Sequence, residues 1–82
     1  MTRLLGEHPL VTVELDDAGR PAAVVWNGRR EPVTVCNRWR VEDGWWARPI
    51  RRDYYKLAGT RWLVLVYQDL ADGTWHLERL YD

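Results

Sequence analysis

Apolar and polar residues alternate with a period of two along most of the chain, and helix-type spacing is nearly absent. In LVTVEL, residues 10–15, the side chains of Val11, Val13 and Leu15 fall on one side of an extended backbone. Gly, Pro and Asp interrupt such runs roughly every eight to twelve residues, which is typical of an all-β sandwich or barrel.

Six segments have the composition of short strands. They are residues 10–15, 22–26, 33–42, 50–57, 61–68 and 74–81. Turn chemistry separates them, including the sequence DDAGRP after the first segment and the pair Asn27-Gly28 after the second. Because closing a sheet removes its exposed edges, the pattern predicts a small antiparallel barrel, SH3-like or related, of five to six strands.

The third and fifth segments carry specific expectations. In the third, Val33, Val35, Trp39 and Val41 are predicted to share one face, with Asn37 as the exception. The fifth is apolar on both faces, which predicts a central strand covered on both sides. The stretch EDGWWARP, residues 42–49, fits either a bulged corner or a single helical turn.

The length and composition fit one small domain spanning residues 1–82. Six Trp and four Tyr, with no Phe, supply large buried areas to a chain whose single cysteine excludes an internal disulfide. The N-terminus lacks the apolar core of a signal peptide or membrane span, so we expect a soluble, cytoplasmic protein.

The charge is unevenly distributed although the net charge is zero. Residues 26–62 hold eight Arg and one Lys against four acids, which gives +5, while residues 1–25 carry −2 and residues 63–82 carry −3. The middle of the chain therefore predicts a basic face. The alternative is that eleven Arg to one Lys reflects a GC-rich genome.

Catalytic signals are absent from the sequence. Cys36 and His76 lie far apart, and no Gly-flanked nucleophile turn, phosphate-binding loop or metal-ligand spacing accompanies them. We expect no enzyme activity, no metal and no cofactor. Cys36 is interpreted as a small filler or an exposed thiol, and His76 as a residue on the solvent side of the last strand.

Arginines beside aromatic residues are typical of nucleic-acid surfaces, because guanidinium groups pair with phosphate and rings stack on bases. In the stretch WWARPIRRDYYKL, alternation places Arg52 and Tyr54 on one side and Arg51, Asp53 and Tyr55 on the other. At least one tyrosine must then be core, and Asp53 is expected to form a surface ion pair with its arginine neighbours. The candidate ligand-binding residues are Trp45, Trp46, Arg48, Arg51, Arg52 and Tyr55, with Arg38 and Arg40 on the outer face of the third strand. Which of Trp45 and Trp46, and which of Tyr54 and Tyr55, faces water stays open.

A resemblance rests on the same residues. The pattern WW…RDYYKL…G…RWLVLVYQDL…GTWHLERLYD, preceded by AVVWNGRR and V…RW, resembles a small bacterial all-β domain that occurs free-standing in actinobacteria. It is also similar to the C-terminal extension of ImuB-type proteins, which are inactive relatives of Y-family translesion DNA polymerases. The resemblance covers residues 22–82 and leaves residues 1–21 without a counterpart.

The resemblance implies an accessory role in DNA-damage tolerance, with nucleic acid or mutasome-type proteins as partners. The polymerase fold is absent from this stretch, so no polymerase residue is carried over. The expected function is a non-catalytic module that binds nucleic acid through the Arg and aromatic patch. The alternative is a protein–protein adaptor or self-associating module that uses the same patch.

Overall fold

The computed structural model describes residues 2–4, 7–43 and 49–81, and these form eight β-strands. The strands are β1 (Thr2–Leu4), β2 (Leu10–Leu15), β3 (Pro21–Trp26), β4 (Arg29–Pro32), β5 (Thr34–Asp43), β6 (Ile50–Ala58), β7 (Leu63–Asp69) and β8 (Trp75–Tyr81). The described part of the chain contains no helix that is long and apolar enough to cross a membrane. The predicted all-β class is confirmed.

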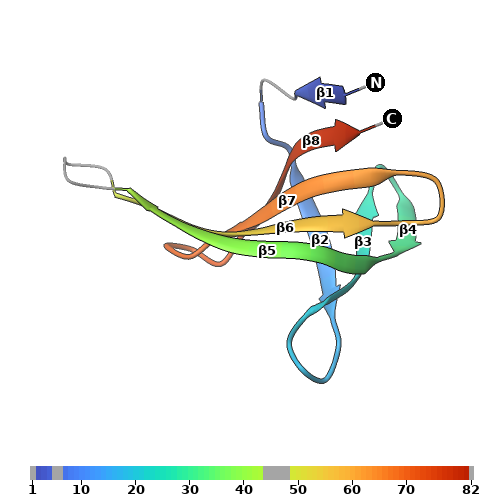
Figure 1. Ribbon diagram of the computed structural model, residues 1–82, viewed down its shortest axis with the longest axis horizontal. Coiled ribbons are helices and arrows are strands. Elements are labelled where there is room, and N and C mark those ends of the chain that lie inside the picture. Colours follow the sequence, from blue (N-terminus) through green and yellow to red (C-terminus); the bar gives the residue numbers. More distant parts are fainter. Residues whose placement is uncertain (1, 5–6, 44–48, 82) are drawn as a thin grey trace.

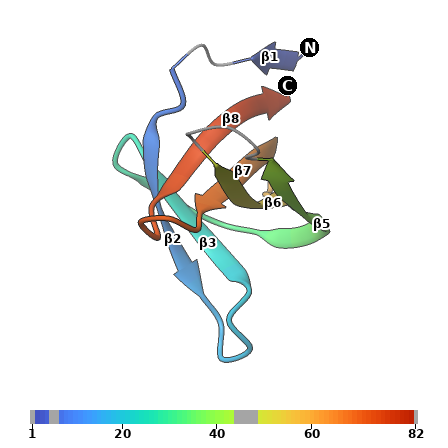
Figure 2. The same cartoon turned by 90° about the vertical axis from the view of Figure 1, so that its left-hand side faces the viewer.

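All strands belong to one curled antiparallel sheet with the order β4-β3-β2-β8-β7-β6-β5, and β1 also pairs with β8. Figure 1 shows β5, β6 and β7 running side by side, with β2 and β3 lying across them. Figure 2 shows the curl of the sheet from the side. The two end strands, β4 and β5, are separated in the chain by Val33 alone, whose backbone N–H donates to the Ala22 carbonyl at 2.9 Å. The sheet is therefore a half-barrel whose two ends the chain itself connects.

The six predicted segments all form strands. The expected count of five to six strands was too low, because β1 and β4 are strands as well. The sequence RREP of β4 carries two arginines, one glutamate and one proline, so it has no apolar alternation that would identify it. It becomes a strand through pairing with β3 across the hairpin turn at Asn27 and Gly28, which both have positive φ, 52° and 76°.

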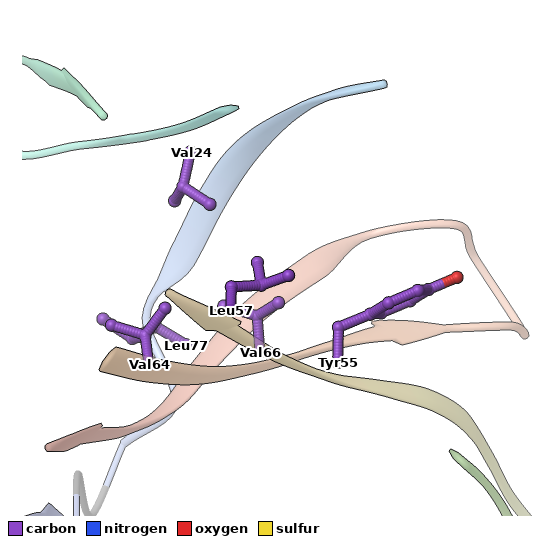
Figure 3. Close-up of a cluster of buried hydrophobic side chains, with 6 residues drawn as sticks. All are labelled: Val24, Tyr55, Leu57, Val64, Val66 and Leu77. Carbon is purple, nitrogen blue, oxygen red and sulfur yellow. The ribbon is translucent and has the colours of Figure 1, made fainter. Parts of the chain in front are cut away.

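The inner face of the sheet carries the main core. Its buried side chains come from β3, β6, β7 and β8 and are Val24, Tyr55, Leu57, Val64, Val66 and Leu77. Figure 3 shows Val24, from β3, opposite the other five side chains of this cluster, which come from β6, β7 and β8. Because the sheet curls over this cluster, one apolar face is removed from water without a second layer of helices.

The outer face of the same strands carries a second, more polar cluster. Tyr54, Leu65 and Tyr67 are buried there, and Val41 and Tyr81 pack against them. Both faces of β7 are thus covered, which confirms the prediction of a doubly covered central strand. His76, expected on the solvent side, is instead half-buried and stacks on the Tyr67 ring, with centroids 5.1 Å apart.

One register shift overturns a prediction. Val33 and Val35 pack on the inner cluster, whereas Val41 packs on the outer one, so the four apolar residues of this segment do not share a face. The cause is a β-bulge between Val35 and Asn37, which inserts Cys36 as an extra residue. Because side chains alternate with a period of two, one extra residue transfers every later side chain of β5 to the opposite face.

A cavity in the inner core should be costly. We expect Leu57→Ala to lower the free energy of unfolding by about 2–5 kcal/mol, since the side chain is fully buried among other apolar groups. Leu10→Ala removes the same atoms from a residue that is 65% exposed, and should change it by no more than about 0.5 kcal/mol. Urea unfolding of the two variants tests this, and equal losses would contradict the assignment of the core.

Candidate nucleic-acid interface

The β5–β6 hairpin brings the candidate arginines of the two strands together. In its register Arg38 lies opposite Tyr55, Arg40 opposite Asp53, and Glu42 opposite Arg51, all on the inner side of the sheet. Figure 1 shows this hairpin extending away from β2, β3 and β4, so these strands do not cover the half of the hairpin that is farthest from them. The prediction that Arg38 and Arg40 lie on the outer face was wrong, because the bulge at Cys36 reverses the later part of β5.

Asp53 is the anchor of this group. Its side chain is only 7% exposed and accepts two hydrogen bonds from Arg40, at 2.7 Å from Nε and 3.1 Å from Nη2. Arg38 donates a third from Nη2 at 3.3 Å. The hydrogen bonds from Arg40, followed by the charge of that guanidinium and the contact from Arg38, hold the pKa of Asp53 below its ordinary value, against the opposing effect of burial.

The ion pair at Asp53 differs from the one expected. Its partners lie across the hairpin and not next to it in the sequence, because neighbouring residues of a strand point to opposite faces. The carboxylate is also buried rather than on the surface. Asp53 therefore fixes two guanidinium groups in place, which a mobile surface pair would not do.

Arg38 keeps most of its hydrogen-bonding capacity. A guanidinium has five N–H donors, and in the described residues one of those on Arg38 is directed at Asp53. Its Cζ lies 5.6 Å from the centroid of the Tyr55 ring, and its side chain is 56% exposed. Tyr55 itself is buried and packs against Trp75, with centroids 5.4 Å apart. Tyr55 thus supports Arg38 and does not offer an open ring face.

Arg51 extends the basic face toward the end of the hairpin. Its Nε lies 4.0 Å from the Glu42 carboxylate, and both side chains are 56% exposed, so this pair is weak and solvated. This side of the hairpin carries three guanidinium groups and two carboxylates that pair with them. They are Arg38, Arg40 and Arg51 with Asp53 and Glu42. Among the described residues of this face, one positive charge is therefore left in excess.

Arg52 lies on the opposite, outer face, as the alternation predicted. Its Cζ lies 4.3 Å from the centroid of the Tyr67 ring, and its Nη1 donates to the Tyr54 hydroxyl at 3.2 Å. The Tyr54 hydroxyl in turn donates to Glu78 at 2.8 Å. Burial raises the pKa of Tyr54. The structure thus separates Arg52 from Arg38, Arg40 and Arg51, and uses it to cover the outer cluster.

The remaining predicted site residues are Trp45, Trp46 and Arg48, which lie outside the described residues. Of the two tyrosines, the sequence interpretation placed one in the core and left the other as a surface candidate. Both Tyr54 and Tyr55 are buried, each on its own face of β6. A doubly covered β6 explains this, because strands on either side and clusters on both faces surround it.

Sequence reasoning missed the exposure of Trp39. Its indole stacks on Tyr54 with centroids 5.5 Å apart and rings 4° from parallel, and the residue is 38% exposed. Ile50 lies on the same outer face of the hairpin and is 39% exposed. Only recognition of the bulge would have placed Trp39 outside, and Cys36 gives no turn signal that reveals it.

The described chain also carries a thiol and side chains of the metal-ligating types. Cys36 is exposed at the bulge, and no group of three or more His, Cys, Asp or Glu side chains is placed to hold a metal ion within residues 7–43 and 49–81. Hollows indent the surface of the described residues at two places. One is lined by residues of the β2–β3 turn and the Val33 region, and the other by Trp26, Trp62 and three neighbours.

No protein-family model, curated protein or solved structure matches this chain. The similarity to ImuB-type extensions therefore stays a prediction from the sequence pattern.

The Asp53 anchor makes stability depend on pH. The pKa of Asp53 is lower in the folded protein than the value of about 3.9 expected for an unfolded chain. The ion pairs of Asp53 with Arg38 and Arg40 therefore stabilise the fold fully at pH values above about 3.9. This stabilisation is lost as the pH falls through the pKa of the folded state. We expect Asp53→Asn to cost about 1–3 kcal/mol near neutral pH, since Arg38 and Arg40 lose the negative charge and one of the two acceptor oxygens that they contact. The difference from the unchanged protein should shrink as the pH falls below the unfolded value of about 3.9.

Urea unfolding at neutral and acid pH measures this difference. Glu14→Gln is the matched control, because it removes a carboxylate that pairs with Arg30 at 2.9 Å on an exposed surface. A cost for Asp53→Asn that is no larger than that of the control would refute the anchoring role.

Proposed function

We propose that the protein is a non-catalytic binding module that contacts single-stranded nucleic acid through the inner side of the β5–β6 hairpin. The observation that carries the proposal is the exposed row of Arg38, Arg40 and Arg51, in which one buried carboxylate, Asp53, fixes the first two guanidinium groups. Guanidinium groups fixed in this way lose less side-chain freedom on binding phosphate than mobile ones do.

Charge arrangement supports nucleic acid over a neutral ligand. The excess positive charge of this face, together with the N–H donors of Arg38 that point away from Asp53, suits bidentate contacts to phosphate oxygens. Phosphate contacts carry affinity without sequence information, so the module is expected to bind many sequences. Together with the resemblance to ImuB-type extensions, this chemistry supports an accessory role in DNA-damage tolerance.

Substitution of Arg38 tests the proposal. We expect Arg38→Gln to weaken binding of a fluorescein-labelled thymidine oligonucleotide about tenfold at low salt, because one phosphate contact is lost. Arg61→Gln is the matched control, since Arg61 is exposed and lies outside the hairpin. Fluorescence anisotropy measures both affinities. Equal affinity of the two variants, or no binding by the folded wild-type protein, would disprove the nucleic-acid proposal.

The second candidate is a protein–protein adaptor that uses the other face of the hairpin. Trp39 and Ile50 are large apolar residues on that face and are more than one third exposed. Exposed tryptophans are frequent anchors of protein interfaces. A second copy of the chain is the simplest occupant to test, because it requires no knowledge of another partner.

Sedimentation velocity at increasing concentration tests this second candidate. Self-association through this face should be abolished by Trp39→Ser, while Arg38→Gln on the opposite face should leave it unchanged. A sedimentation coefficient that does not change with concentration in the unsubstituted protein would argue against self-association.

A further inference from the structure

A hollow of about 290 Å³ lies at the other end of the half-barrel from the hairpin tip. The hollow is lined by residues of the β3–β4 hairpin, the β6–β7 connection and the end of β8, namely Trp26, Asn27, Arg29, Trp62 and Leu80. Residues far apart in the sequence therefore converge on it. Its volume is near the lower limit for small-molecule sites, so it can hold a group of the size of a nucleotide base, with the rest of the ligand at the open rim.

The two indoles in the hollow differ from the other described tryptophans. Trp39 stacks on Tyr54 and Trp75 packs against Tyr55, so each of these rings has an aromatic neighbour. Among the rings that the structure describes, neither Trp26 nor Trp62 has such a neighbour, and both are only partly buried. Their ring systems contact the core on one side and the hollow on the other, which leaves aromatic surface available for a ligand.

The polar groups at the hollow are equally available. Within residues 7–43 and 49–81, no carboxylate lies within ion-pair distance of Arg29, whereas Arg30 beside it is paired with Glu14. The nearest acid on the same side of β4 is Glu31, whose carboxylate accepts a hydrogen bond from the backbone N–H of Thr60 at 2.6 Å. Asn27, in the positive-φ conformation of the β3–β4 turn, also lines the hollow.

We propose that this hollow binds a mononucleotide unit, with the base against the two indoles and the phosphate on Arg29. A base stacks on any aromatic face, and a guanidinium pairs bidentately with phosphate oxygens. The Asn27 amide offers one donor and one acceptor, which match the hydrogen-bonding edge of a heteroaromatic base. A simple aromatic carboxylate would satisfy Arg29 but would leave this amide unused.

This site is separate from the hairpin face and does not depend on the function proposed for it. Its residues come from β3, β4, β8, the β3–β4 turn and the β6–β7 connection, and none belongs to the strands β5 and β6. A failure of one proposal therefore leaves the other intact, and the two experiments use different ligands and different arginines.

The indole N–H signals in a ¹H–¹⁵N correlation spectrum report on the site directly. Trp26→Phe and Trp62→Phe assign the two signals. We expect adenosine 5′-monophosphate to shift both signals in a saturable way at concentrations on the order of 1 mM. Unmodified adenosine should bind about tenfold more weakly, because it lacks the phosphate that pairs with Arg29.

The variants Arg29→Gln and Arg38→Gln provide the matched comparison. Arg29→Gln should weaken adenosine monophosphate binding about tenfold, and Arg38→Gln should leave it unchanged. Backbone amide signals that stay as dispersed as in the wild-type spectrum show that both variants retain the fold. The proposal is overturned if neither hollow indole shifts, if Arg29→Gln binds as the wild type does, or if benzoate binds as tightly as the nucleotide.

Discussion

One extra residue in β5 decides which side chains the protein presents on each face of its hairpin. The bulge at Cys36 reverses the alternation between Val35 and Asn37. Before it, Val35 faces the inner core; after it, Arg38 and Arg40 face inward and Trp39 faces outward. Without the bulge, both arginines would lie on the outer face, away from Asp53.

This reversal places a buried carboxylate beside the arginines of the proposed binding surface. Asp53 lies on the inner side of β6, just beyond the part of the sheet that packs around Leu57 and Val66. A buried carboxylate without partners would be unfavourable, so its position requires guanidinium groups on the opposite strand. The ion pairs with Asp53 also fix Arg38 and Arg40 side by side at the protein surface. The same interaction thus contributes to stability and orients the groups proposed to bind phosphate.

The alternation of apolar and polar residues was sufficient to predict six strands and the two faces of β6, because successive side chains of an extended backbone point to opposite sides. It did not reveal β4, which has no apolar periodicity and depends on pairing with β3. It also did not reveal the partners of Asp53, since cross-strand register depends on the hairpin connection and on the bulge. The hollow between Trp26 and Trp62 is a long-range feature, and only the curled sheet brings its residues together.

The central claim is that exposed guanidinium groups on the inner side of the β5–β6 hairpin bind phosphates of a single strand. The most direct test is the salt dependence of oligonucleotide affinity in the unsubstituted protein and in the Arg38→Gln, Arg51→Gln double variant. Each phosphate contact contributes about 0.7 to the slope of log K against log salt for single strands, so the slope should become shallower by about 1.4 in the double variant. Identical slopes for the two proteins would contradict the claim.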